Sequence, residues 1–119
     1  MKGSLRSKSK DFSIKIIKLF KWLTDRNEHV MSKQLLRSGT SVGANIRESE
    51  YAVSRKDFLN KLTIALKECN ESAYWLELLY ETNYIEQQEY NELYNMCLEI
   101  LRMLKSSTRT LKERVEDNE

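Results

Sequence analysis

The side chains best suited to chemistry in this sequence are three glutamates that stand on two neighbouring predicted helices. Glu48, Glu68 and Glu71 lie close together if those helices pack side by side, and grouped carboxylates can transfer protons or bind a metal. The one histidine, His29, stands in a short polar connection, and the chain has no Glu-x-x-His motif of the kind that di-iron bundles use. The sequence therefore predicts no catalytic residues, no metal site, no cofactor and no small-molecule substrate.

The two cysteines, Cys69 and Cys97, fall on apolar helical stripes. Cysteines in such positions are more often buried thiols than a disulfide or a metal pair, so we expect them to serve packing alone. Near the N-terminus Lys15 and Lys18 interrupt the apolar residues, which leaves neither a signal-peptide core nor a membrane-spanning run. These patterns predict a cytoplasmic protein without a membrane partner.

The glycine pair Gly39 and Gly43 is a second motif that could have a chemical role. A phosphate-binding loop needs a Gly-Lys-Ser/Thr sequence and a preceding strand, and this chain has neither. Residues four apart lie on one face of a helix, where the absence of side chains lets another helix backbone approach. The pair therefore predicts close helix packing.

The elements that must position these residues are helices. The chain has 119 residues, no proline and three glycines, with 32% charged and 40% hydrophobic residues, a composition that excludes an all-β fold and suits a single domain. Apolar periodicity predicts helices at about 9–27, 32–53, 54–82 and 86–115. Because their connections are short, we predict an all-α, antiparallel up-down-up-down four-helix bundle.

Capping residues set the expected helix boundaries. Ser9 and Ser32 are the expected N-caps of the first two helices, and Ser54 with Asp57 resembles a capping box for the third. Asn83 suits the left-handed conformation that ends a helix. The second helix is expected to continue through Tyr51, on its apolar seam, to about Val53.

The third predicted helix is apolar on two faces. Its main seam is a nearly continuous heptad pattern that begins at Phe58 and ends at Leu79. Only one face can meet the core of its own chain, so the second face predicts a contact with another subunit. The residues of this predicted interface are Leu59, Tyr74, Trp75 and Leu78.

Polar residues on the second and third helices are expected to form a partly buried network that fixes their pairing. The members of this predicted network are Asn45, Glu48, Lys67, Glu68 and Glu71, with Lys61 as a further partner.

Charge is unevenly distributed along the chain, although the net charge is only +2. Residues 1–22 hold seven Lys/Arg and one acid, whereas residues 68–101 hold eight glutamates and no Lys/Arg. An up-down bundle gathers the basic residues at one end, where they would attract a phosphate backbone. The candidate nucleic-acid-binding residues are Lys8, Lys10, Lys15, Arg47, Arg55, Lys56, Lys61, Arg109 and Lys112.

Two functional hypotheses follow from this charge pattern, and both stay open at this point. One is an RNA- or DNA-binding module. The other is a homo-oligomeric protein scaffold in which the charged side chains only keep the helix surfaces soluble. The aromatic residues Tyr74, Trp75, Tyr80 and Tyr84 lie among glutamates, which favours packing over stacking on bases.

Three segments in order carry a family resemblance: Ser38-Gly-Thr-Ser-Val-Gly-Ala-Asn-Ile-Arg-Glu48, Ser54-Arg-Lys-Asp-Phe58 and Ala65-Leu-Lys-Glu-Cys-Asn-Glu-Ser-Ala-Tyr-Trp-Leu76. From about Phe12 to Leu104, the chain resembles the four-helix bundle proteins encoded by intervening sequences of bacterial large-subunit ribosomal RNA genes. The resemblance implies a bacterial, non-enzymatic antiparallel bundle that forms a ring-shaped homopentamer, with ribosomal RNA or other nucleic acid as a proposed partner. Cys69 stands where the family more usually has alanine.

Overall fold

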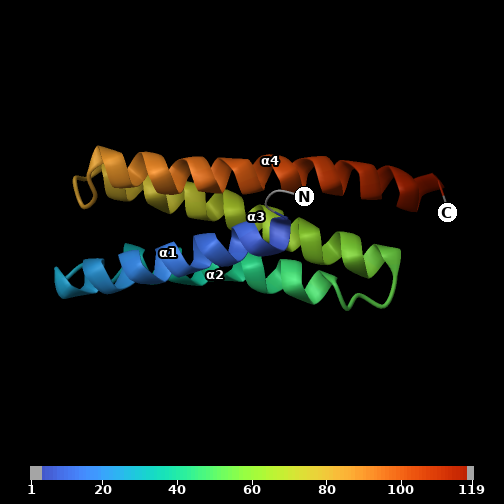
Figure 1. The fold of residues 1–119 in the computed structure, drawn as a ribbon, viewed down its shortest axis with the longest axis horizontal. Helices are drawn as coiled ribbons and strands as arrows, with labels where there is room; N and C mark the ends of the chain where they lie inside the picture. Colours follow the sequence, from blue (N-terminus) through green and yellow to red (C-terminus); the bar gives the residue numbers. More distant parts are fainter. Residues whose placement is uncertain (1–3, 118–119) are drawn as a thin grey trace.

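The computed structural model describes residues 4–117 and consists there of four helices: α1 (Leu5–Asp25), α2 (Met31–Ser49), α3 (Arg55–Glu81) and α4 (Gln87–Asp117). Successive helices are joined at alternating ends of an elongated molecule, so each runs opposite to the one before (Figure 1). α1 and α3 each pack against both α2 and α4. This arrangement confirms the predicted all-α four-helix bundle.

The buried apolar side chains of all four helices form one core cluster. α1 supplies Phe12, Ile16, Leu19 and Leu23, whose spacing of four, three and four residues keeps them on one face of the helix. The heptad seam of α3 is likewise buried between Leu62 and Leu79. The periodicity of the sequence therefore identifies the residues that hold the bundle together.

Cys69 on α3 and Cys97 on α4 meet in the middle of this core, with their sulfur atoms 3.6 Å apart. Cys69 Sγ contacts the carbonyl oxygen of Cys97 at 3.3 Å, and Cys97 Sγ contacts that of Cys69 at 3.2 Å. The hydrogen bond with Cys69 and burial together raise the pKa of the Cys97 thiol. Both cysteines are free thiols that are fully buried.

α1 begins earlier than predicted. Its N-cap is Ser4, whose side chain accepts a hydrogen bond from the backbone N–H of Ser7 at 3.1 Å, so the prediction that Ser9 caps this helix is wrong. Ser9 is buried inside the helix, where its hydroxyl donates to the carbonyl of Arg6. Nothing between Ser4 and Ser9 breaks a helix, and the earlier serine offers the same capping chemistry one turn sooner.

The start of α2 depends on a glutamate that precedes the helix. The carboxylate of Glu28 accepts hydrogen bonds from the backbone N–H groups of Val30, Met31 and Ser32 at 3.2, 3.2 and 2.7 Å. The prediction that Ser32 is the N-cap is wrong. Ser32 lies in the first turn of the helix, and its hydroxyl donates to the carbonyl of Glu28. Asn27, at φ 67°, turns the chain so that Glu28 can reach these donors.

We expect Glu28→Ala to lower the free energy of unfolding by about 1 kcal/mol, because three N–H groups at the start of α2 lose their acceptor. Burial acts to raise the pKa of Glu28, but the hydrogen bonds outweigh it, so the pKa is lower in the folded protein than in the unfolded chain. This contribution is therefore fully present above the unfolded pKa and is lost as the pH falls through the folded pKa. Urea unfolding between about pH 6 and pH 3 measures it.

Glu28→Gln is the control, because an amide keeps an acceptor oxygen but does not titrate. The difference in stability between the wild type and this variant should shrink as the pH falls. A difference that stayed constant over the same range would contradict the capping role of the carboxylate.

α2 ends at Ser49, so the prediction that it continues to about Val53 is wrong. The cap of α3 accounts for the difference. Ser54 is extended and accepts from the backbone N–H of Asp57 at 3.0 Å, while the Asp57 carboxylate accepts from the backbone N–H of Val53 at 3.2 Å. This double interaction, anticipated by the capping-box motif, ties the residues before Ser54 to the next helix.

The other predicted boundaries agree with the structure to within two residues, and Asn83 has the predicted left-handed conformation, with φ 68°. Among residues 4–117, no helix combines the length and the apolar character needed to span a membrane.

Candidate nucleic-acid interface

α1 and α2 pack closely together beside the candidate site. A Cβ atom added to Gly39 would lie 3.0 Å from Cγ2 of Ile16, and one added to Gly43 would lie 3.4 Å from the side-chain oxygen of Ser13. The two glycines thus lie on the face of α2 that packs against α1. This contact fixes the positions of the basic side chains that flank it.

One basic groove lies between the start of α1 and the end of α2. It has a volume of about 340 Å³ and is lined by Arg6, Ser9, Lys10 and Ser13 from α1 and by Gly43, Ala44 and Arg47 from α2. Arg6 pairs with Glu50 at 3.5 Å. Within residues 4–117, Lys10 and Arg47 make no ion pair, so their charges face solvent.

A second basic groove, of about 520 Å³, lies between α3 and α4. Lys105, Arg109 and Lys112 form its α4 side, at spacings that place them on one helix face, and α3 contributes Leu59, Thr63 and Leu66. In the described part of the chain these three cations also have no ion pair.

Both grooves are lined by the parts of the helices nearer the α2–α3 connection: the start of α1 and the end of α2 for the first, and the first half of α3 and the second half of α4 for the second. That connection lies on the right in Figure 1. The exposed side chains of Arg55 and Lys56 stand at the same connection, in the first turn of α3. A helix N-terminus carries a partial positive charge, which adds to theirs. We call this region the basic end; it comprises Arg6, Lys10, Arg47, Arg55, Lys56, Lys105, Arg109 and Lys112.

Three of the predicted phosphate-binding residues are instead engaged in ion pairs. Lys8 pairs with Glu99 at 2.9 Å, Lys15 pairs with Glu92, and Lys61 contacts Glu48 at 3.5 Å. A neighbouring carboxylate offsets much of the charge that a phosphate would meet. Of the predicted phosphate-binding residues, the basic end therefore includes Lys10, Arg47, Arg55, Lys56, Arg109 and Lys112. The other three, Lys8, Lys15 and Lys61, are engaged in ion pairs within the protein.

Sequence reasoning missed Arg6 as a groove residue. Its position one turn before Lys10 on the same helix face was the available signal, but the predicted start at Ser9 placed it outside the helix.

The opposite end of the bundle is acidic. It carries Glu77, Glu81, Glu86, Glu89 and Glu92, around the connection between α3 and α4. Burial and the neighbouring charges of Glu92 and Glu86 raise the pKa of Glu89, against the opposing effect of Arg26. The carboxylates around this connection repel anions, so it attracts a phosphate backbone less than the basic end does.

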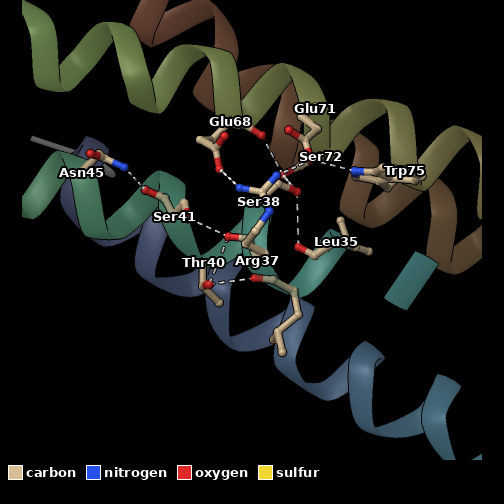
Figure 2. A network of polar contacts seen from close by, with 11 residues as sticks. Leu35, Arg37, Ser38, Thr40, Ser41, Asn45, Glu68, Glu71, Ser72 and Trp75 are labelled. Atoms are coloured by element: carbon tan, nitrogen blue, oxygen red, sulfur yellow. Dashed lines mark hydrogen bonds and ion pairs between the residues drawn. The ribbon is translucent and has the colours of Figure 1, made fainter. Parts of the chain in front are cut away.

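A polar network joins the middle of α2 to α3 (Figure 2). Arg37 pairs with Glu68 at 2.8 Å and with Glu71, and Glu71 also accepts from the indole N–H of Trp75 at 2.9 Å. Beside them, the buried hydroxyls of Ser72 and Ser38 lie 2.9 Å apart. The network predicted for this helix pair is thus centred on Arg37, which sequence reasoning did not include.

Three of the five predicted network members lie outside this network. Glu48 contacts Lys61 at 3.5 Å, a separate pair between the same two helices. Asn45 donates from its side chain to the carbonyl of Ser41 in its own helix at 2.8 Å. Lys67 is exposed and makes no ion pair within residues 4–117. In an antiparallel helix pair, residues equally far from the connection face each other, which brings Arg37 rather than Asn45 opposite Glu68 and Glu71.

The contacts of this network stabilise the charged form of Glu71. The hydrogen bond from Trp75 lowers the pKa of Glu71, and the charge of Arg37 acts in the same direction, while burial opposes both. A carboxylate held in its charged form by two donors is a poor proton donor at neutral pH. The network therefore joins α2 to α3 through ion pairs and a buried hydroxyl contact.

Two of the predicted interface residues, Leu59 and Trp75, meet different neighbouring helices. Leu59 lies in the groove beside α4, whereas Trp75 lies about 24 Å further along α3 and faces the α2 network. Tyr74 is 53% exposed and makes an edge contact with the Trp75 ring. On α1, Ile14, Ile17 and Trp22 are also exposed.

Comparison with known proteins adds the following. A family model described as "23S rRNA-intervening sequence protein" matches residues 3–106. The crystal structure of a protein of unknown function from the S23 ribosomal protein family of Bacteroides thetaiotaomicron VPI-5482 is similar at 53% identity and a TM-score of 0.87, covering 88% of this chain and 98% of that one. No curated protein matches the chain.

Proposed function

Since the chain belongs to the family of 23S rRNA-intervening sequence proteins, we propose that it is a non-enzymatic protein that binds RNA or DNA through its basic end. The observation that carries this proposal is the pair of grooves in which Lys10, Arg47, Lys105, Arg109 and Lys112 make no ion pair within residues 4–117. Cations without an internal partner can pair with phosphates without first giving up an ion pair within the protein.

The physical basis of such binding is counterion release. Each Lys or Arg that neutralises a phosphate releases a condensed cation from the nucleic acid, and this gain falls as the salt concentration rises. The acidic end repels the same ligand, so the molecule would approach the backbone with the α2–α3 connection foremost. The description of the family links it to 23S ribosomal RNA, which makes a ribosomal RNA helix the first ligand to test.

The test is a titration of the protein into a labelled ribosomal RNA helix from an intervening-sequence region, followed by fluorescence anisotropy at several salt concentrations. If about five phosphates are contacted, the slope of log K against log salt should lie near −4 to −5. An absence of binding even at about 50 mM salt would overturn the proposal.

A second candidate is self-assembly, with the protein acting as a homo-oligomeric scaffold. The exposed apolar side chains of Ile14, Ile17 and Trp22 on α1 favour it, because exposed apolar residues that lie on one element mark contact surfaces. Tyr74 is exposed on α3, a helix that does not pack against α1. The family resemblance implies a homopentamer. In a closed ring, the basic ends of all subunits would face one side and enlarge the positive surface.

Tyr74→Glu tests the α3 part of this contact. The side chain is half exposed, so we expect the variant to fold but to sediment as a smaller species, because a carboxylate would be buried in the interface. Analytical ultracentrifugation of both proteins measures the change. If the oligomer kept its size, Tyr74 would not belong to the interface.

A further inference from the structure

The connection between α2 and α3, which lies between Arg47 and Arg55 in the sequence, carries two exposed apolar side chains. Tyr51 is 83% exposed and Val53 is 92% exposed. The sequence pattern placed Tyr51 on the buried seam of α2, but the helix ends two residues before it. Exposed apolar side chains that stand close together mark interaction sites, so this pair points to a role in binding.

The backbone of this connection is held in place. The N–H of Tyr51 donates to the carbonyl of Glu48 at 3.0 Å, and the N–H of Ala52 donates to that of Ser49 at 3.2 Å. The N–H of Val53 donates to the Asp57 carboxylate. Three successive N–H groups are therefore satisfied within the protein, and the Tyr51 ring is presented from a fixed position.

The charges around Tyr51 favour a phosphate-bearing ligand. Arg47 lies one helical turn before it, and Arg55 and Lys56 follow it at the start of α3. The nearby acids are engaged, since Glu48 contacts Lys61, Glu50 contacts Arg6 and Asp57 caps α3. A second copy of the chain would bring an equally positive end to this position, which opposes a contact between like ends.

We propose that Tyr51 is a stacking platform for an unpaired base of the bound nucleic acid. The ligand class is then an RNA or DNA with looped-out, bulged or single-stranded nucleotides, whose phosphates would contact Arg47, Arg55 and the grooves of the basic end. Aromatic stacking beside a cationic track is the combination that single-strand binders use, because every base offers a ring face. This inference rests on the proposed function and specifies its ligand.

The experiment compares two RNA ligands that share one stem sequence and the same number of phosphates, one with an unpaired loop and one fully paired. We expect Tyr51→Ala to weaken binding of the looped ligand about 10- to 100-fold and to leave the paired ligand and the salt slope unchanged. Tyr51→Phe, which keeps the ring, should bind the looped ligand like the wild type. Tyr84→Ala, which removes an exposed tyrosine near the acidic end, is the matched control.

The outcomes separate this inference from the proposed function. If the wild type binds both ligands and Tyr51→Ala binds the looped one equally well, the stacking role is overturned while nucleic-acid binding stands. If the wild type binds neither ligand, both are overturned. If Tyr51→Ala loses self-association in the ultracentrifuge and keeps its RNA affinity, the side chain belongs to a subunit contact and the inference is wrong.

Discussion

Gly39→Val is expected to reduce the free energy of unfolding by about 3 kcal/mol, the upper range for overpacking a close contact. A Cβ at this position would already lie 3.0 Å from Cγ2 and 3.1 Å from Cγ1 of Ile16. Ile16 is itself fully buried in the core and cannot swing aside, so the two further methyl groups of valine must push α1 away from α2. Chemical denaturation of the two proteins measures the difference.

Two variants of the same helix serve as controls. Ala44→Val places the same β-branched residue at an exposed position, so it measures only the small loss of helix propensity. Gly43→Ala adds one carbon at ordinary contact distance, 3.4 Å from its nearest neighbours, and should be neutral or stabilising by up to about 1 kcal/mol. Equal losses for Gly39→Val and Ala44→Val would contradict a close approach at Gly39.

Replacing Arg47, Arg109 and Lys112 with glutamine is expected to weaken nucleic-acid binding several-hundred-fold at about 0.1 M salt. Each phosphate contact contributes nearly a factor of ten at that salt concentration through counterion release, so three lost contacts multiply to this size. The salt slope should fall by about 2.7 units for a duplex ligand. Anisotropy titrations over a salt series measure both quantities.

The matched control removes three positive charges from elsewhere. Lys18, Lys21 and Lys33 are exposed and lie outside the basic end, so their replacement by glutamine gives the same net charge as the test variant. This control should keep most of the affinity and nearly all of the salt slope. If both triple variants lost affinity equally, binding would depend on net charge alone, and the basic end would not be the site.

The fold could be predicted from the sequence because the strongest patterns are local. The seam from Leu62 to Leu79 needs only a helical period to be recognised, and Ser54 with Asp57 marks the start of α3 through contacts within four residues. Short connections between long helices then leave one simple arrangement. The separation of basic and acidic ends follows from that arrangement and the order of charges along the chain.

The details that escaped prediction depend on how side chains meet across helices. Lys8 and Lys15 pair with Glu99 and Glu92 on α4, and only the packing of α1 against α4 decides which lysines find such partners. Arg37 reaches Glu71 because of the register between α2 and α3. The Glu28 cap was missed for a different reason, since a glutamate before the helix replaced the serine that capping preferences favour.

The facing cysteines offer a way to follow motion inside the bundle. Cys69 and Cys97 have no exposed surface, and the pKa of the Cys97 thiol is raised, so the folded protein presents almost no thiolate to a reagent. Alkylation of either cysteine therefore requires a transient separation of α3 and α4. When this parting is rapidly reversible, the labelling rate relative to that of an unfolded peptide gives the fraction of molecules open at any moment, and thus the free energy of local opening at the centre of the molecule.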